Sequence, residues 1–216
     1  MKYKAFIFDF DYTLADATTG IVECVNYALI QAGLKPASRE NIRKTVGMTL
    51  RDILYELTGI NDNKSADKFF SDFISRADDI MTESTVLFDD TIDILSRIKQ
   101  DGYKTAVVTT KVRYRVDEIL DKYSFTGLID YIVVYEDVEN VKPSPEGLIK
   151  AINYFGDDKS SVLFIGDTLI DANTAFNASV DFAAVLTGTT GQNEFLDLPH
   201  VCISKNLTEL FECLFN

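Results

Sequence analysis

Several side chains that could do chemistry stand directly after apolar stretches of strand length in this 216-residue sequence. The first are two aspartates, with one residue between them, after the run Ala5-Phe6-Ile7-Phe8. Hydroxyl and lysine groups follow the next two stretches, and a second pair of aspartates follows the fourth. In chain order the set is Asp9, Asp11, Thr109, Thr110, Lys111, Lys142, Asp167, Thr168 and Asp171. Each alone has a bland explanation, so their shared position carries the argument for function.

This combination of groups suits the hydrolysis of a phosphate monoester. A carboxylate such as Asp9 can attack phosphorus and form an aspartyl phosphate, but its charge must be screened from an anionic substrate. Mg²⁺ prefers carboxylate and substrate oxygens, and Asp9 and Asp167 could supply the carboxylates. Asp171, one helical turn after Asp167, could bind the same ion or orient a ligand. Asp11 could protonate the leaving oxygen and later accept a proton from water.

The remaining groups would bind phosphate, and one alternative site can be set aside. Lys142 and Thr109 would hold the non-bridging phosphate oxygens. A calcium-binding loop is the obvious rival, since Asp9-x-Asp11-x-Thr13 begins like one. Such a loop needs Gly at its sixth place and Glu at its twelfth, where this chain has Leu14 and Gly20. We therefore reject the calcium loop.

Six nearly continuous apolar stretches predict strands buried on both faces, as in a parallel sheet. They cover residues 4–8, 105–109, 131–135, 161–165, 182–186 and 201–204. Helical patterns alternate with them at residues 90–101, 112–123, 145–155 and 171–178. This alternation predicts an α/β fold with a Rossmann-like, doubly wound parallel sheet. Ligands of such sheets bind beyond the carboxyl ends of the strands, where the residues above fall.

Residues 16–86 break the alternation, because they contain helical patterns and no convincing strand. We expect helices at 21–32 and 65–81, a short helix that Ser38 caps and that ends near Gly47, and another from Thr49 to Gly59. The economical interpretation is an all-helical cap domain at 16–86, inserted into an α/β catalytic core formed by 1–15 and 87–216. The loop at 45–49 is our candidate for a substrate contact.

Composition and charge limit the kinds of binding partner that we expect. The net charge is −13 and no basic cluster occurs, so we expect no nucleic-acid partner. No apolar run reaches the roughly 18 residues of a membrane span, and the N-terminus lacks a signal-peptide pattern. We therefore expect a cytoplasmic protein with no membrane partner, as a monomer or weak homodimer. Cys24, Cys202 and Cys213 lie far apart, which predicts buried core residues and neither a disulfide nor a zinc site.

Four motifs, in this order, resemble those of the haloacid dehalogenase superfamily of phosphohydrolases. They are Asp9-Phe10-Asp11-Tyr12-Thr13-Leu14, Val107-Val108-Thr109, Lys142-Pro143 and Gly166-Asp167-x-x-x-Asp171. The resemblance covers essentially the whole chain. The position of the helical insertion, Thr109-Thr110-Lys111 and Lys142-Pro143-Ser144-Pro145-Glu146 are similar to the phosphoglycolate phosphatase-like branch. Each motif alone is weak, and the combination is specific.

The resemblance implies a function and a role for each matching residue. It implies a Mg²⁺-dependent phosphatase that hydrolyses a small phosphate monoester through an aspartyl-phosphate intermediate. Asp9 would be the nucleophile, and Asp11 would be the general acid and base that also gives its backbone carbonyl to the metal. The residues assigned to Mg²⁺ are Asp9, Asp11, Asp167 and Asp171, and those assigned to phosphate are Thr109, Thr110 and Lys142.

The sequence departs from the family pattern in ways that leave the substrate open. Tyr12 stands where many members have Gly, and Thr110 replaces a common Asn. Related phosphomutases carry a histidine early in the cap, whereas the only histidine here is His200. A phosphomutase is therefore the weaker alternative, together with a phosphate-binding protein that lacks turnover. Asp11 argues against dehalogenation, because the dehalogenases of the superfamily lack this second aspartate.

Overall fold

The computed structural model describes residues 2–215 and divides into two compact units. The first unit comprises the chain up to Ala15 and from Leu87 onward, and the second comprises Asp16–Val86. A six-stranded parallel sheet in the order β5-β4-β1-β6-β7-β8 forms the first unit, which confirms the predicted α/β fold. Its strands are β1 (Ala5–Phe8), β4 (Lys104–Val108), β5 (Tyr131–Val133), β6 (Val162–Gly166), β7 (Asp181–Val185) and β8 (Cys202–Ser204).

The register of the three central strands brings their carboxyl ends to one level. In β1, Phe8 pairs with Val107 of β4 on one side and with Ile165 of β6 on the other. The Asp9 N–H extends the ladder by donating to the Ile165 carbonyl at 2.8 Å. The first residues after β1, β4 and β6 therefore lie side by side at one edge of the sheet.

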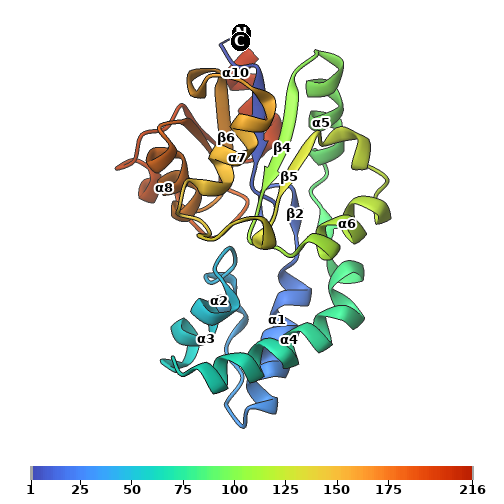
Figure 1. Cartoon of the computed structure of the whole chain (residues 1–216), viewed down its shortest axis with the longest axis vertical. Coiled ribbons are helices and arrows are strands. Elements are labelled where there is room, and N and C mark those ends of the chain that lie inside the picture. Colours follow the sequence, from blue (N-terminus) through green and yellow to red (C-terminus); the bar gives the residue numbers. More distant parts are fainter. Residues whose placement is uncertain (1, 216) are drawn as a thin grey trace. The chain divides into compact units, whose positions relative to one another are not determined.

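Alternate residues of the strands enter two separate apolar cores, one on each face. Phe6 and Phe8 face helices α5, α6 and α10, whereas Ala5 and Ile7 face helices α7 and α8. Both sets are apolar because helices cover both faces, which explains the continuous apolar runs in the sequence. These helices are visible around the sheet in Figure 1. Their bounds are α5 (Thr91–Gln100), α6 (Arg113–Lys122), α7 (Glu146–Phe155), α8 (Leu169–Ala178), α9 (Gln192–Phe195) and α10 (Leu207–Phe215).

The second unit is helical. It contains α1 (Thr18–Gln31), α2 (Arg39–Arg43), α3 (Leu50–Thr58) and α4 (Asn63–Ser84), and α1 packs mainly against α4. Ser38 and Thr49 cap α2 and α3 as predicted, since each side chain accepts a hydrogen bond from the backbone N–H three residues later. Two short strands, β2 (Ala15–Asp16) and β3 (Val86–Leu87), pair where the chain leaves and re-enters the first unit.

Some details differ from the sequence predictions. The helix after Ser38 ends at Arg43 instead of near Gly47, because the chain turns with short-range hydrogen bonds at Thr45 and Val46. Helices α9 and α10, the two-residue strands β2 and β3 at the two ends of segment 16–86, and the short 3₁₀ segments were not predicted. The 3₁₀ segments are Thr126–Leu128, Tyr135–Asp137 and Lys159–Ser161. Among the described residues, no helix combines the length and apolar character that a membrane span requires.

The cysteine prediction was wrong in part. Cys24 is buried in α1 as expected, whereas Cys202 is half-buried and Cys213 is exposed. Cys213 lies on α10, whose buried side chains are Leu207, Leu210 and Phe211. These three residues recur at helical spacing and define the core-facing side of the helix, and position 213 falls outside that stripe.

Candidate active site

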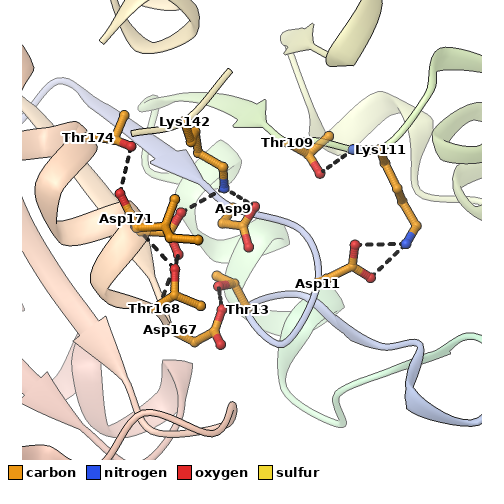
Figure 2. Close-up of polar contacts among 11 residues, drawn as sticks. Asp9, Asp11, Thr13, Thr109, Lys111, Lys142, Asp167, Thr168, Asp171 and Thr174 are labelled. Atoms are coloured by element: carbon orange, nitrogen blue, oxygen red, sulfur yellow. Dashed lines mark hydrogen bonds and ion pairs between the residues drawn. The ribbon is translucent and has the colours of Figure 1, made fainter. Parts of the chain in front are cut away.

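Asp9 and Lys142 form the centre of the candidate site (Figure 2). The Lys142 ammonium donates to Asp9 Oδ1 at 2.5 Å and to Asp171 Oδ1 at 2.7 Å. At most 5% of any of these three side chains is exposed, so water screens the ion pairs very little. Lys142 is therefore not an exposed loop lysine, and its charge is paired with the predicted nucleophile Asp9 and the predicted metal ligand Asp171.

The other oxygen of Asp171 is held by the start of its own helix. Thr168 caps α8 by accepting a hydrogen bond from the Asp171 N–H, and its hydroxyl and N–H donate to Asp171 Oδ2 at 2.6 and 3.2 Å. This reciprocal arrangement is a capping box. Asp171 is fully buried, so both of its carboxylate oxygens are fixed, one by the helix start and one by Lys142.

Asp167 carries the one buried side-chain oxygen or nitrogen that has no hydrogen-bond partner in the described part of the chain. Its Oδ1 accepts a hydrogen bond from the Thr13 hydroxyl at 3.3 Å, and its Oδ2 is unpaired. The loop after β7 lies close to this oxygen, because a Cβ atom added to Gly188 would stand only 1.9 Å from it. An orphaned buried carboxylate oxygen costs free energy unless something compensates it.

The geometry of the three buried aspartates fits a divalent cation. One oxygen each from Asp9, Asp167 and Asp171 lies within 4.8 Å of the others. Carboxylate oxygens are the protein ligands that Mg²⁺ prefers. With Asp11 and its partner Lys111 included, four carboxylates and two ammonium groups leave two excess negative charges when all are ionised. A divalent cation would balance that excess and pair the orphaned oxygen of Asp167.

Crowding of these charges shifts the pKa values of the site. The pKa of Asp9 is raised to about 7; burial is the largest cause, Lys142 opposes the rise, and the neighbouring Asp171 adds to it. Burial also raises the pKa of Asp167 well above its usual value, and Asp171 and Asp9 add to the effect. For Lys142, burial favours the neutral form, but Asp171 and Asp9 outweigh it and raise the pKa. Without a cation, the protein therefore resists full ionisation of this cluster.

Asp11 lies beside Asp9 in the chain but has a different partner. Lys111 donates to Asp11 Oδ1 at 2.7 Å and to Oδ2 at 2.8 Å, so the pair is bidentate. In Figure 2 this pair is separate from the group around Lys142. Tyr12, which follows Asp11, has a φ of 60° in the left-handed region. Glycine adopts that region at no steric cost, whereas a tyrosine there is uncommon.

The predicted phosphate-binding residues occupy the end of β4. Thr109 directly follows the strand, is buried, and accepts a hydrogen bond from the Lys111 N–H through its hydroxyl at 3.2 Å. Thr110 lies in the same turn. The structure thus gathers Thr109, Thr110 and Lys142 around the carboxyl ends of β4 and β1, while their contact with phosphate remains a prediction.

The sequence analysis assigned no role to four residues that structure the site. Lys111 pairs with Asp11, Thr13 donates to Asp167, Thr168 holds Asp171, and Gly188 approaches Asp167. Only Thr168 had a usable signal, because a threonine followed three residues later by an aspartate at a helix start indicates a capping box. The other three contacts join residues far apart in the sequence.

Comparison with known proteins identifies the relatives of this chain. The sequence model of the family described as haloacid dehalogenase-like hydrolases matches residues 6–185. Pyrophosphatase PpaX from Bacillus cereus is 28% identical over 185 residues, which cover 86% of this chain and 84% of that protein. N-acetylmuramic acid 6-phosphate phosphatase from Pseudomonas aeruginosa is 28% identical over 189 residues, which cover 87% of this chain and 84% of that protein.

The fold is also found among solved structures. The crystal structure of a protein from Bacteroides fragilis, described as a haloacid dehalogenase-like hydrolase, superimposes with a TM-score of 0.94. It is 37% identical in sequence, and the match covers 97% of this chain and 100% of that one. The shared architecture therefore extends over nearly the full length of both chains.

Proposed function

Because the chain belongs to the haloacid dehalogenase-like hydrolase family and has phosphatases among its curated relatives, we propose that it is a Mg²⁺-dependent phosphatase that hydrolyses a small phosphate monoester. The observation that supports this most strongly is the buried cluster of Asp9, Asp167 and Asp171 around the Lys142 ammonium. Buried carboxylates without such compensation would be too costly to keep. Asp9 and Asp167 follow the adjacent strands β1 and β6, and Asp171 lies in the first turn of α8. This placement favours a catalytic centre.

The proposed reaction uses the two aspartates that follow β1, and their closeness in the chain supports it. A carboxylate oxygen of Asp9 attacks phosphorus, the bond from phosphorus to the leaving oxygen breaks, and Asp11 gives that oxygen a proton. Water then attacks the phosphorus of the aspartyl phosphate and gives a proton to Asp11, while the bond from phosphorus to Asp9 breaks. Two aspartates at the end of one strand can serve both halves of this reaction.

Asp9, Asp167 and Asp171 would hold Mg²⁺, with the backbone carbonyl of Asp11 as a further ligand suggested by the family motif. When bound, Mg²⁺ would supply charge stabilisation to the phosphoryl oxygens. Lys142 keeps Asp9 oriented and offsets its charge as an anionic substrate approaches. Thr109 and Thr110 would donate to non-bridging oxygens. We further propose that the helical unit Asp16–Val86 acts as the cap that selects the substrate.

For the substrate, we propose a phosphoglycolate-like ester. The motifs resemble the phosphoglycolate phosphatase-like branch, and the curated relatives are named for pyrophosphate and N-acetylmuramic acid 6-phosphate. A panel should therefore contain phosphoglycolate, pyrophosphate, sugar phosphates and nucleotides. The ranking of kcat/KM across this panel would identify the leaving group.

The test is phosphate release from this panel, with and without Mg²⁺, by the wild type and by Asp9→Asn. Asp9→Asn removes the nucleophile and a metal ligand, so we expect turnover to vanish while circular dichroism shows an intact fold. Asp158→Asn is a matched control, because Asp158 is exposed before β6, at the opposite edge of the sheet. Substantial activity in Asp9→Asn would refute the covalent route, and no release from any ester by the wild type would refute the phosphatase.

A further inference from the structure

The site contains a second buried lysine that the proposed reaction does not use. Lys111 and Asp11 are each about nine-tenths buried, and the Lys111 ammonium contacts both oxygens of Asp11. Lys142 offsets the charge of Asp9 and Asp171, whereas Lys111 is paired with Asp11 alone. Figure 2 shows the two lysines approaching the acidic groups from different places. The two lysine ammonium groups therefore neutralise different carboxylates of the site.

Lys111 is held in position and retains a hydrogen-bond donor. Its N–H donates to the Thr109 hydroxyl at 3.2 Å, and its carbonyl accepts from the Tyr135 N–H at 3.0 Å. The ammonium also lies 5.7 Å from the centroid of the Phe10 ring, a cation–π distance. An ammonium has three donors, and Asp11 accounts for two contacts. In the part of the chain that the structure describes, the third donor has no protein acceptor.

Lys111 lies where the proposed reaction places the leaving group. In the proposed reaction Asp11 protonates the leaving oxygen, so the leaving group must lie next to Asp11 and within reach of the same ammonium. The rest of the centre is acidic, and the whole chain carries a net charge of −13. An anionic leaving group would be repelled here unless a cation met it.

We propose that Lys111 is a specificity-determining residue that binds an anionic group on the leaving portion of the substrate. The ligand chemistry is a carboxylate or a second phosphoryl group close to the leaving oxygen, as in phosphoglycolate or pyrophosphate. The inference rests on the proposed phosphatase function and narrows its substrates to those with a charged leaving group. Neutral alcohols would leave the third donor of Lys111 without an ionic partner.

The alternative is that Lys111 only holds Asp11 in place. That role would affect every ester alike, because Asp11 would serve every leaving group. A role in binding the leaving group would affect charged leaving groups more than neutral ones. The ratio of kcat/KM between two matched substrates separates these roles, because any shared effect through Asp11 largely cancels in the ratio.

The matched substrates are 2-phosphoglycolate and 2-hydroxyethyl phosphate, which differ by a carboxylate in place of a neutral hydroxymethyl group. Pyrophosphate provides the phosphoryl form of the anion. The enzymes are the wild type, Lys111→Met, Lys111→Arg and the control Lys104→Met, all assayed with Mg²⁺. Lys104 is also ion-paired, to Asp157 at 2.8 Å, but it stands at the opposite end of β4.

We expect Lys111→Met to reduce the preference for phosphoglycolate over the neutral ester by roughly 10- to 100-fold, the loss typical of a charged hydrogen bond. Lys111→Arg should retain most of that preference, and Lys104→Met all of it. A loss confined to phosphoglycolate or to pyrophosphate would identify which anion Lys111 binds.

If Lys111→Met left the ratio of kcat/KM between the charged and the neutral ester unchanged, whether or not both values fell, the inference would be overturned while the phosphatase function stands. If the wild type released phosphate from no ester of the panel, the proposed function would fail and this inference with it. Release from other panel esters but from neither phosphoglycolate nor pyrophosphate would overturn this inference alone.

Discussion

Replacing Gly188 by alanine should abolish tight binding of the divalent cation without unfolding the protein. A Cβ atom at this position would lie 1.9 Å from Asp167 Oδ2 and 2.8 Å from its Cγ, whereas real Cβ contacts are almost never under 3.0 Å. Rotation of the carboxylate alone cannot relieve this, since the Cγ contact is also too short. The Asp167 side chain or the loop must therefore move by about 1 Å.

The loop has little freedom to absorb that movement. The Thr187 hydroxyl donates a hydrogen bond to the Tyr12 carbonyl, and the Leu186 N–H donates to the Ser204 carbonyl at 2.9 Å. Both bonds hold the chain just before Gly188, so we expect the carboxylate of Asp167 to yield. Mg²⁺ tolerates deviations of only about 0.2 Å in its ligand distances. A shift of about 1 Å therefore removes Asp167 as a ligand.

The expected loss of Mg²⁺ affinity is about 100-fold or more, which corresponds to about 2.7 kcal/mol. Isothermal titration of Mg²⁺ measures it directly and does not depend on turnover. Gly191→Ala is the matched control in the same loop, because Gly191 has a φ of −78° and its added Cβ would meet only Glu194 Oε1 at 3.5 Å. Wild-type Mg²⁺ affinity in Gly188→Ala would show that Asp167 is not held against this loop as the structure has it.

Two further predictions follow from the electrostatics and from the helix cap. Burial raises the pKa of Asp9 to about 7 and that of Asp167 well above its usual value. The folded state then binds more protons than the unfolded state between about pH 4 and 7, so metal-free protein should lose stability as pH rises through this range. Urea unfolding in a chelator at pH 5 and pH 7.5 tests this, and greater stability at the higher pH would contradict it. Thr168→Val, which removes the side-chain cap of α8, should cost about 1 kcal/mol of stability and reduce kcat/KM about tenfold. Ser38→Ala removes the cap of α2 and should lower stability without changing kcat/KM. Equal kcat/KM values in the two variants would contradict an effect of the α8 cap on the reaction.

The fold could be predicted because its determinants are local or periodic. Continuous apolar runs predicted strands covered on both faces. A glycine, Gly102 or Gly156, directly follows the helical patterns at 90–101 and 145–155, where helices α5 and α7 end. The end of α2 was predicted too late, because Gly47 is the stop signal in the sequence, whereas hydrogen bonds of the Thr45 and Val46 N–H groups end the helix at Arg43. Helix α10 was missed although Leu207, Leu210 and Phe211 are at helical spacing.

The candidate site could be predicted only as far as strand ends dictate it. Parallel strands gather their carboxyl ends at one edge, so Asp9, Thr109 and Asp167 had to come close once the sheet order was β4-β1-β6. The sequence does not indicate which of these side chains pair with one another. Lys111 and Asp11 are 100 residues apart, and whether a lysine at a strand end meets one aspartate or another depends on side-chain conformations that no local pattern encodes.

The contacts around Asp171 connect helix formation to the proposed nucleophile. Thr168 fixes one oxygen of Asp171 as part of starting α8, and the other oxygen of Asp171 receives Lys142, which in turn holds Asp9. Asp171, Lys142 and Asp9 are all buried, so water screens the interactions among them very little. Loss of the Thr168 hydroxyl would leave Asp171 Oδ2 with the Thr168 N–H as its donor. We expect this to loosen Asp171, and through Lys142 to let Asp9 turn. A helix cap worth about 1 kcal/mol of stability is for this reason expected to affect the orientation of Asp9, the proposed nucleophile.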